Sequence, residues 1–186
     1  MKNIVLFASG SGSNVENIVF YFKKSLNINV AHVYTNNPDA GVIERCKRLK
    51  VPCTVFTKEE FRNGEVLEKV KADNPELLVL AGFLLLVPPL FVQAYPNKII
   101  NMHPALLPDY GGKGMYGSKV HRAVIENKEP ITGITIHYVN EQFDKGEIIL
   151  QSSFEIKEYS LEYVEKHIHE LEHHWFPIMI ERLLLA

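Results

Sequence analysis

The chain is predicted to be an α/β protein: a three-layer, doubly wound, mostly parallel sheet with a late antiparallel hairpin and a long C-terminal helix. Three observations predict this fold. Apolar runs alternate with amphipathic stretches over the first hundred residues, which is typical of βαβ units with right-handed crossovers. Two later runs are joined by a short acidic loop, and a long helical stretch closes the chain.

The parallel part of the sheet is predicted from five short, largely apolar runs. Their length and composition suit strands that are buried on both faces. In chain order they are Ile4–Ala8, Val30–Tyr34, Val51–Phe56, Leu77–Ala81 and Lys98–Met102.

The first two helices are indicated by spacing and by capping residues. Apolar residues recur at i, i+3, i+4 and i+7 from Val15, with Ser13 or Asn14 as the expected N-cap. Asp39 is expected to cap a second helix that ends near Leu49.

The remaining elements follow from a capping box and from longer patterns. Thr57 and Glu60 form a capping box that starts another helical region. Further helices are expected at Pro88–Ala94, Ser118–Asn127 and Ser160–Leu184, with the hairpin strands at Ile131–Val139 and Glu147–Ile156. Because no linker, repeat or low-complexity segment interrupts this order, residues 1–186 are predicted to be a single domain.

The composition argues against several classes of function. A net charge of -2 over 186 residues gives no strong field that would attract nucleic acid or an anionic membrane. The two cysteines, Cys46 and Cys53, lack metal-type spacing and are expected to be reduced thiols of a cytoplasmic protein. Met1–Asn3 leads directly into a strand without a signal-peptide pattern, and Val79–Pro89 is too short for a membrane span.

A glycine-rich loop, Gly10–Asn14, lies between the first strand and the first helix. Backbone N–H groups there meet the positive end of the helix dipole and can hold a phosphate. A dinucleotide site is not expected, because Val15 replaces the third glycine and Thr35–Asn37 brings no acidic residue. The P-loop lysine is also missing. A phosphomonoester on a small substrate fits the loop, and a tight turn that only packs is the alternative.

Asn101 and His103 are two residues apart at the end of the fifth strand, so their side chains point to the same side. Ligands bind at the carboxyl ends of strands in open α/β sheets. An amide and an imidazole placed there can polarise a carbonyl and move a proton. Asp144, in the acidic loop between the late strands, is a candidate to accept a hydrogen bond from His103 and raise its pKa. Loop capping and turn formation are the structural alternatives.

The last helix contains His169-Glu170-Leu171-Glu172-His173, which satisfies both the H-E-x-x-H and the H-x-x-E-H zinc patterns. Its apolar stripe, however, runs along a different face, so both histidines are expected to turn away from the core. No obvious third ligand follows closely. No metal site is therefore predicted. Glu172, at the border of the stripe, is kept as a candidate site residue.

Six stretches together resemble the folate-dependent phosphoribosylglycinamide (GAR) formyltransferases of the formyltransferase family. They are Ala8–Asn14, Leu80–Phe83, Asn101–Pro108, Gly133–Val139, Asp144–Gly146 with Ile149–Gln151, and Glu172-His173 before Pro177. The resemblance covers nearly the whole chain. It implies a Rossmann-like formyltransferase fold and, in purine biosynthesis, transfer of a formyl group from the co-substrate 10-formyltetrahydrofolate to the glycinamide amine.

The resemblance also implies roles for individual residues. Asn101 would hold the formyl oxygen as it becomes an oxyanion, His103 would be the general acid/base, and Asp144 would keep the pKa of His103 high. The implied substrate-binding residues are Gly12, Ser13, Asn14, Met102, Pro104 and Glu172. The implied folate-binding residues are Leu84, Leu85, Leu86, Val87, Asn101, Val139, Asn140 and Glu141, with Arg62 in place of an arginine that would align with Gly64.

Two features depart from the family pattern. Leu84–Leu86 stand where many members have an arginine, so contacts there would come from the backbone or from apolar side chains. The loop Tyr110–Gly117 is longer and richer in glycine than is usual.

Other functions remain as alternatives. A formyltetrahydrofolate hydrolase and a methionyl-tRNA formyltransferase share the Asn-x-His and Asp set, but each is expected to carry a further domain. A zinc peptidase and a non-enzymatic ligand-binding module come from other classes. Small-molecule partners are expected, with no nucleic acid or membrane partner, and the chain is expected to be a monomer or homodimer.

Overall fold

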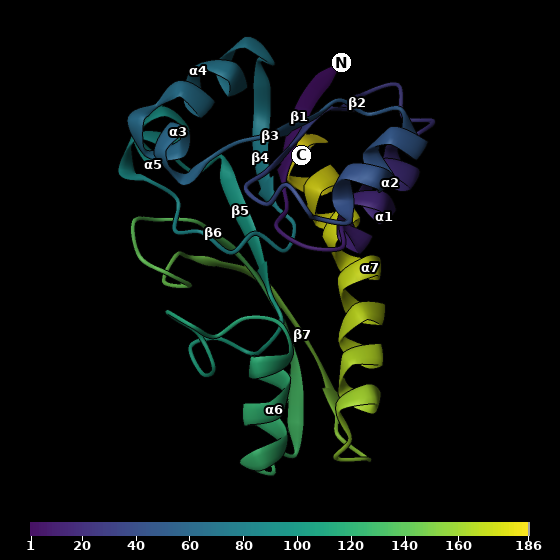
Figure 1. Cartoon of the computed structure of the whole chain (residues 1–186). Coiled ribbons are helices and arrows are strands. Elements are labelled where there is room, and N and C mark those ends of the chain that lie inside the picture. Colours follow the sequence, from purple (N-terminus) through teal and green to yellow (C-terminus); the bar gives the residue numbers. More distant parts are fainter. Residues whose placement is uncertain (186) are drawn as a thin grey trace.

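The computed structural model describes residues 1–185 and contains one seven-stranded sheet in the order β3-β2-β1-β4-β5-β6-β7 (Figure 1). β3, β2, β1, β4 and β5 are parallel, whereas β6 is antiparallel to β5 and β7 is antiparallel to β6. The strands are β1 (Lys2–Phe7), β2 (Ile28–Thr35), β3 (Cys53–Val55), β4 (Pro75–Leu80), β5 (Ile99–His103), β6 (Ile131–Tyr138) and β7 (Ile148–Glu155). This confirms the predicted fold class.

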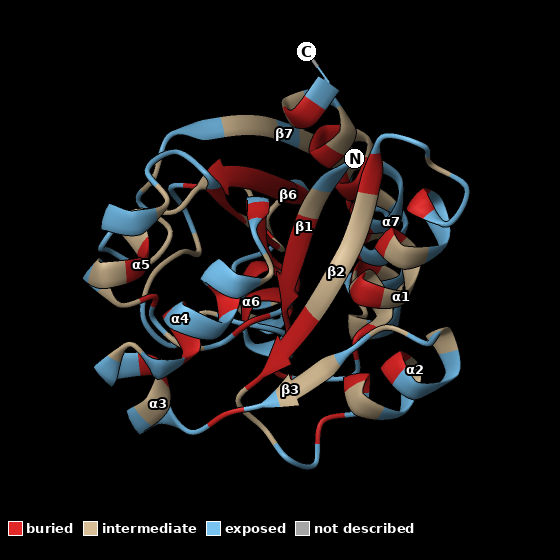
Figure 2. Cartoon of the chain, turned by 90° about the horizontal axis from the view of Figure 1, so that it is seen from above, coloured by how far each residue is buried: buried red, intermediate tan, exposed pale blue. Residues whose placement is uncertain are grey.

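Helices cover both faces of the sheet. They are α1 (Ser13–Phe22), α2 (Val42–Leu49), α3 (Lys58–Asn63), α4 (Glu65–Ala72), α5 (Pro89–Ala94), α6 (Ser118–Glu126) and α7 (Leu161–Leu185). On β1, Ile4 and Leu6 face the core shared with α1, α2 and α7, while Val5 and Phe7 face the core shared with α3, α4 and α5. Two-sided burial explains why the central strands are nearly continuous apolar runs (Figure 2).

The two predicted side-chain N-caps are wrong. Gly12 is the N-cap of α1 with a φ of 78°, and Gly41 is the N-cap of α2. The reason is close packing of the two loops: the Val42 N–H donates to the Gly10 carbonyl at 3.1 Å, and a Cβ at Gly12 would lie 2.5 Å from the Val42 side chain. Only glycine fits that turn, so geometry rather than side-chain capping determines where these helices begin.

The predicted capping box at α3 is confirmed: the Thr57 hydroxyl accepts from the Glu60 N–H, and the Glu60 carboxylate accepts from the Thr57 N–H. Gly64, with a φ of 96°, then separates α3 from α4. The third strand is shorter than expected, because only Cys53–Val55 pairs with β2 at the edge of the sheet.

Helix α7 is the longest element and contains Pro177 in its interior. Proline has no N–H, so the carbonyl four residues earlier, that of His173, loses its helical donor. The Asn17 side-chain amide of α1 donates to this carbonyl at 2.8 Å. A cross-helix hydrogen bond therefore replaces the missing one and joins α7 to α1.

No helix within residues 1–185 is both long enough and apolar enough to cross a membrane.

The β6–β7 hairpin depends on a close approach of its strands at Gly133, which pairs with Ser153. A Cβ at Gly133 would lie 2.0 Å from the Ser152 carbonyl oxygen. We expect Gly133→Ala to lower the free energy of unfolding by about 1–3 kcal/mol, because the backbone of one strand must shift. Urea unfolding monitored by circular dichroism measures this loss. Gly10→Ala is the control, since no atom lies within 4 Å of its Cβ position, and equal midpoints for the two variants would contradict the prediction.

Candidate active site

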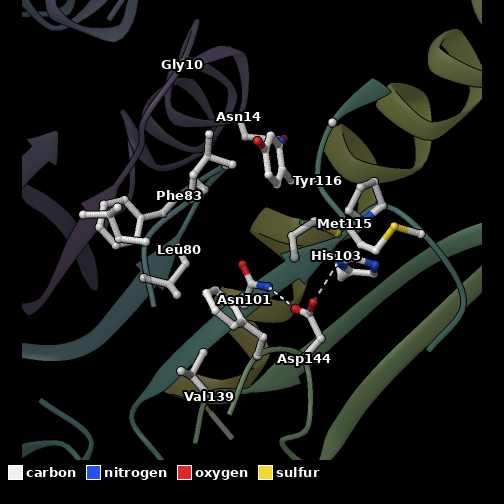
Figure 3. A pocket seen from close by; sticks show the side chains of 18 of the residues that line it. Gly10, Asn14, Leu80, Phe83, Asn101, His103, Met115, Tyr116, Val139 and Asp144 are labelled. Atoms are coloured by element: carbon white, nitrogen blue, oxygen red, sulfur yellow. Dashed lines mark hydrogen bonds and ion pairs between the residues drawn. The ribbon is translucent and has the colours of Figure 1, made fainter. Parts of the chain in front are cut away.

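A pocket of about 660 Å³ lies at the carboxyl ends of β1, β4 and β5 (Figure 3). β1 pairs with β2 on one side and with β4 on the other, so the strand order reverses beside this pocket. Such a switch point is where open α/β sheets bind ligands. The wall is formed by segments of the first loop, β4 and its following loop, β5, the 112–117 loop, α6, the 139–144 loop and α7.

The loop Gly10–Asn14 forms one end of the pocket. It enters α1 through Gly12, so backbone N–H groups of the first helical turn are free to bind an anion. Arg45 of α2 stabilises the loop, because its Nε–H donates to the Ser11 carbonyl at 2.8 Å. The same guanidinium forms an ion pair with Glu16 of α1. The loop therefore offers backbone N–H groups in an arrangement that can bind an anion.

Asn101 lies on β5 directly opposite His137 of the antiparallel strand β6, so the two side chains share one face. The Asn101 amide nitrogen lies 3.2 Å from His137 Nε2 and 3.4 Å from Asp144 Oδ1. His137 Nδ1 donates to the Tyr138 carbonyl at 2.8 Å, and its Nε2 lies 3.5 Å from Asp144 Oδ1. The amide nitrogen of Asn101 therefore points toward Asp144, as Figure 3 shows.

His103 is 3 % exposed at the end of β5. Its Nε2–H donates to the Tyr110 carbonyl at 2.8 Å, and its Nδ1 lies 3.6 Å from Asp144 Oδ2. Since a carbonyl can only accept, Nδ1 is the nitrogen that gains or loses a proton. The structure thus brings His103 and Asp144 together, at the distance of an ion pair rather than of the expected hydrogen bond.

The pKa of His103 is lower than expected, although Asp144 acts on it in the expected direction. Burial lowers the pKa of His103 below its usual value, and the nearby Asp144 carboxylate and Tyr110 carbonyl only partly oppose this effect. The imidazole is therefore neutral near pH 7 and ready to accept a proton.

Asp144 lies in the loop between β6 and β7 with a φ of 53°. Burial alone would raise the pKa of its carboxyl group, but His137, His103 and the Gly112 N–H outweigh burial and lower it. That N–H donates to Oδ2 at 2.9 Å. Asp144 is therefore a carboxylate held between two imidazoles.

Glu172 of α7 is 7 % exposed and faces the Gly10–Asn14 loop. Its Oε2 accepts from the Asn14 side-chain amide at 3.0 Å and lies 3.1 Å from His169 Nδ1. The hydrogen bond to Glu172 raises the pKa of His169. The hydrogen bond between Asn14 and Glu172 joins the first loop to the last helix, although the two residues are 158 positions apart in the chain.

The histidines of the zinc-like pattern have different surroundings. His169 lines the pocket and pairs with Glu172, whereas His173 does not line it. Within residues 1–185, no group of three or more His, Cys, Asp or Glu side chains is placed to hold a metal ion.

Most residues expected from the resemblance line this pocket. Gly12, Ser13, Asn14, Met102, Pro104, Leu84–Val87, Val139 and Asn140 all do so. Glu141 is not part of the lining. Arg62 lines a second pocket of about 250 Å³ together with Lys58, and this pocket shares Leu85–Val87 with the first.

Sequence reasoning missed three histidines of the lining: His121, His137 and His169. For His137 a signal was available, since a histidine interrupts the apolar strand opposite Asn101. Met115 and Tyr116, from the glycine-rich loop, also face the pocket, with Tyr116 near Asn14 and Met115 near His103 in Figure 3.

Comparisons with known proteins agree with this arrangement. A family model described as "Formyl transferase" matches residues 2–180. The "Phosphoribosylglycinamide formyltransferase" of Bacillus subtilis is 38% identical, with 99% of this chain and 95% of the relative covered; that of Escherichia coli is 30% identical, with 96% and 85% covered. The crystal structure of glycinamide ribonucleotide transformylase 1 from Geobacillus kaustophilus superposes with a TM-score of 0.89 at 35% identity, covering 99% of both chains.

The electrostatics of the pocket can be tested through His103. We expect Asp144→Asn to lower the pKa of His103 further, because the variant keeps the burial and loses the attraction of the carboxylate for the imidazolium. NMR titration of the histidine ring protons in the two proteins measures the shift. His103→Gln assigns the resonance, and an unchanged or higher pKa in Asp144→Asn would show that the carboxylate does not act on this ring.

Proposed function

The chain belongs to the formyl transferase family, and on that premise we propose that it is a phosphoribosylglycinamide formyltransferase. It transfers the formyl group of 10-formyltetrahydrofolate to the amine of phosphoribosylglycinamide, a step of de novo purine biosynthesis. The observation that carries this proposal is the single pocket that combines a backbone phosphate site with Asn101, His103 and Asp144, in a chain similar to such enzymes over nearly its full length. These full-length relatives do not favour a hydrolase or a zinc peptidase.

The phosphate of the ribonucleotide is proposed to bind the backbone N–H groups of Gly12, Ser13 and Asn14, which lie at the positive end of α1. Met102 and Pro104 would then line the ribose side. The buried carboxylate of Glu172 is proposed to accept hydrogen bonds from the glycinamide amino end.

His103 is proposed to move the proton of the reaction at Nδ1. The neutral imidazole accepts a proton from the attacking amine, and the Asp144 carboxylate 3.6 Å away stabilises the imidazolium that forms. His103 then returns the proton to the folate nitrogen as the carbon–nitrogen bond to the formyl group breaks. The proton lost by the amine is thus the proton gained by the folate nitrogen, and tetrahydrofolate leaves without a further reactant.

Asn101 is proposed to stabilise the oxyanion on the formyl carbon. Its amide nitrogen now contacts Asp144 at 3.4 Å, which is a long hydrogen bond. Rotation of the amide toward the pocket would exchange this weak contact for a short, charge-assisted one in the transition state.

The folate is proposed to lie between two segments, Leu84–Val87 and Val139–Glu141, whose lining side chains offer apolar walls with backbone polar groups. Arg62, beside Lys58 in the adjoining pocket, is placed to attract the anionic tail of the folate. No metal is needed for these roles.

We further propose that the protein acts in the cytoplasm as a monomer or homodimer. The two free thiols, Cys46 and Cys53, suit a reducing compartment.

A direct assay tests the function. Purified protein is mixed with 10-formyltetrahydrofolate, with or without phosphoribosylglycinamide and with or without a chelator, and tetrahydrofolate release is followed. Release that requires the ribonucleotide and survives the chelator is expected. Release without the ribonucleotide would indicate a hydrolase instead, and no release would overturn the proposal.

The proposed proton transfer predicts that His103→Ala and Asp144→Ala each lower turnover by at least about a hundredfold, the scale of acid/base catalysis. Steady-state kinetics with both substrates saturating measures the loss. Asp109→Ala is the control, because Asp109 is an exposed carboxylate just before Tyr110 and should leave turnover unchanged. Turnover near that of the control in either variant would remove the residue from the mechanism.

A further inference from the structure

Two buried side-chain atoms within residues 1–185 lack a hydrogen-bond partner: Asn14 Oδ1 and His121 Nδ1. Both residues line the main pocket. An unsatisfied buried polar atom destabilises a protein by about 1–3 kcal/mol, so such atoms are rare. Because both residues belong to the wall of one pocket, a molecule bound there can supply the missing partners.

His121 is held firmly in place. It lies on α6, where Val120 and Val124 are buried on either side of it in sequence, and α6 packs against α7. His121 is only 5 % exposed, so in this structure its ring is enclosed between α6 and its surroundings rather than turned toward solvent.

The charged neighbours of His121 locate it within the pocket. Burial lowers the pKa of His121; Glu165 and Glu172 of α7 act in the opposite direction, and His169 and His103 add to the lowering. The ring therefore lies within electrostatic range of both Glu172, which contacts the phosphate loop through Asn14, and the catalytic His103. It is neutral near pH 7, with one nitrogen that donates and one that accepts.

In phosphoribosylglycinamide, the group between the phosphate and the reacting amine is the ribose. We propose that His121 is a ribose-binding residue whose Nδ1 forms a hydrogen bond with a sugar hydroxyl. A hydroxyl both donates and accepts, so it pairs with Nδ1 in either tautomer of the ring. The inference rests on the proposed function, because that function supplies the ribose.

A matched pair of variants separates the hydrogen bond from the packing. Leucine and asparagine have nearly the same shape and leave the same space, but only asparagine keeps a polar atom near the Nδ1 position. We expect His121→Leu to raise the KM for the ribonucleotide about tenfold, the scale of one hydrogen bond, with little change in kcat or in the KM for the folate. His121→Asn is expected to restore most of the affinity.

His167→Leu is the control, because His167 Nδ1 donates to the Tyr163 carbonyl within α7 and His167 does not line the pocket. Equal KM values for His121→Leu and His121→Asn would overturn the proposal and leave His121 a packing residue. A loss of kcat at unchanged KM would also overturn it.

Deoxyribose analogues identify the hydroxyl. The wild-type protein is expected to bind either the 2′-deoxy or the 3′-deoxy ribonucleotide more weakly, and His121→Leu is expected to bind that analogue and the parent compound equally, because the shared hydrogen bond is already lost. If each deoxy analogue weakens binding as much in His121→Leu as in the wild type, the two losses of affinity are additive, and a contact between His121 and the sugar is contradicted.

Calorimetry with the ribonucleotide alone keeps the two proposals distinct. If the wild type binds the ribonucleotide more tightly than His121→Leu but transfers no formyl group, the proposed function fails and the ribose site stands. If transfer occurs and the variant binds equally well, the ribose site fails and the proposed function stands.

Discussion

The antiparallel pairing of β5 with β6 is the constraint on which the rest of the site depends. Its register places Asn101 opposite His137 and His103 opposite Thr135. A slip of β6 by one residue would turn His137 and Thr135 to the face of the sheet opposite Asn101 and His103. The same pairing sets where β6 ends, and therefore where the loop that carries Asp144 begins.

Thr135 shows how this pairing also shapes the loop after β5. Its hydroxyl donates to the Ala105 carbonyl at 2.7 Å and accepts from the Leu107 N–H at 3.0 Å. The Gln151 amide donates to the Leu107 carbonyl from β7. The loop is thereby held against two strands, and it leads to Tyr110, whose carbonyl orients the His103 ring. A chain of buried hydrogen bonds thus connects strand register to the tautomer of one imidazole.

The overall architecture could be predicted from the sequence because it follows from the periodicity of apolar residues. Alternating strands and helices, the capping box at Thr57 and the late hairpin all depend on local patterns. The helix starts at Gly12 and Gly41 were missed because two loops distant in sequence pack against each other there.

Only part of the candidate site could be predicted from the sequence. Asn101 and His103 could be paired from strand geometry, but the burial that sets the pKa of His103 is a property of the assembled fold. His121 had no signal at all, since a histidine on an amphipathic helix is unremarkable until its Nδ1 is found buried without a partner. Arg62 was expected from the resemblance, and it lies on α3 in the second pocket, which shares Leu85–Val87 with the main one.

The proline in α7 has a mechanical consequence for this architecture. Because the His173 carbonyl accepts a hydrogen bond from Asn17 of α1, α7 cannot slide along its axis without breaking a bond to the helix that follows the Gly10–Asn14 loop. Glu172 is the residue just before that carbonyl, and it contacts Asn14 one turn earlier on the same α1. The two hydrogen bonds form a two-point clamp between the first and last helices. The clamp therefore fixes the Glu172 carboxylate beside the Gly10–Asn14 loop, so these two parts of the pocket wall keep one relative position.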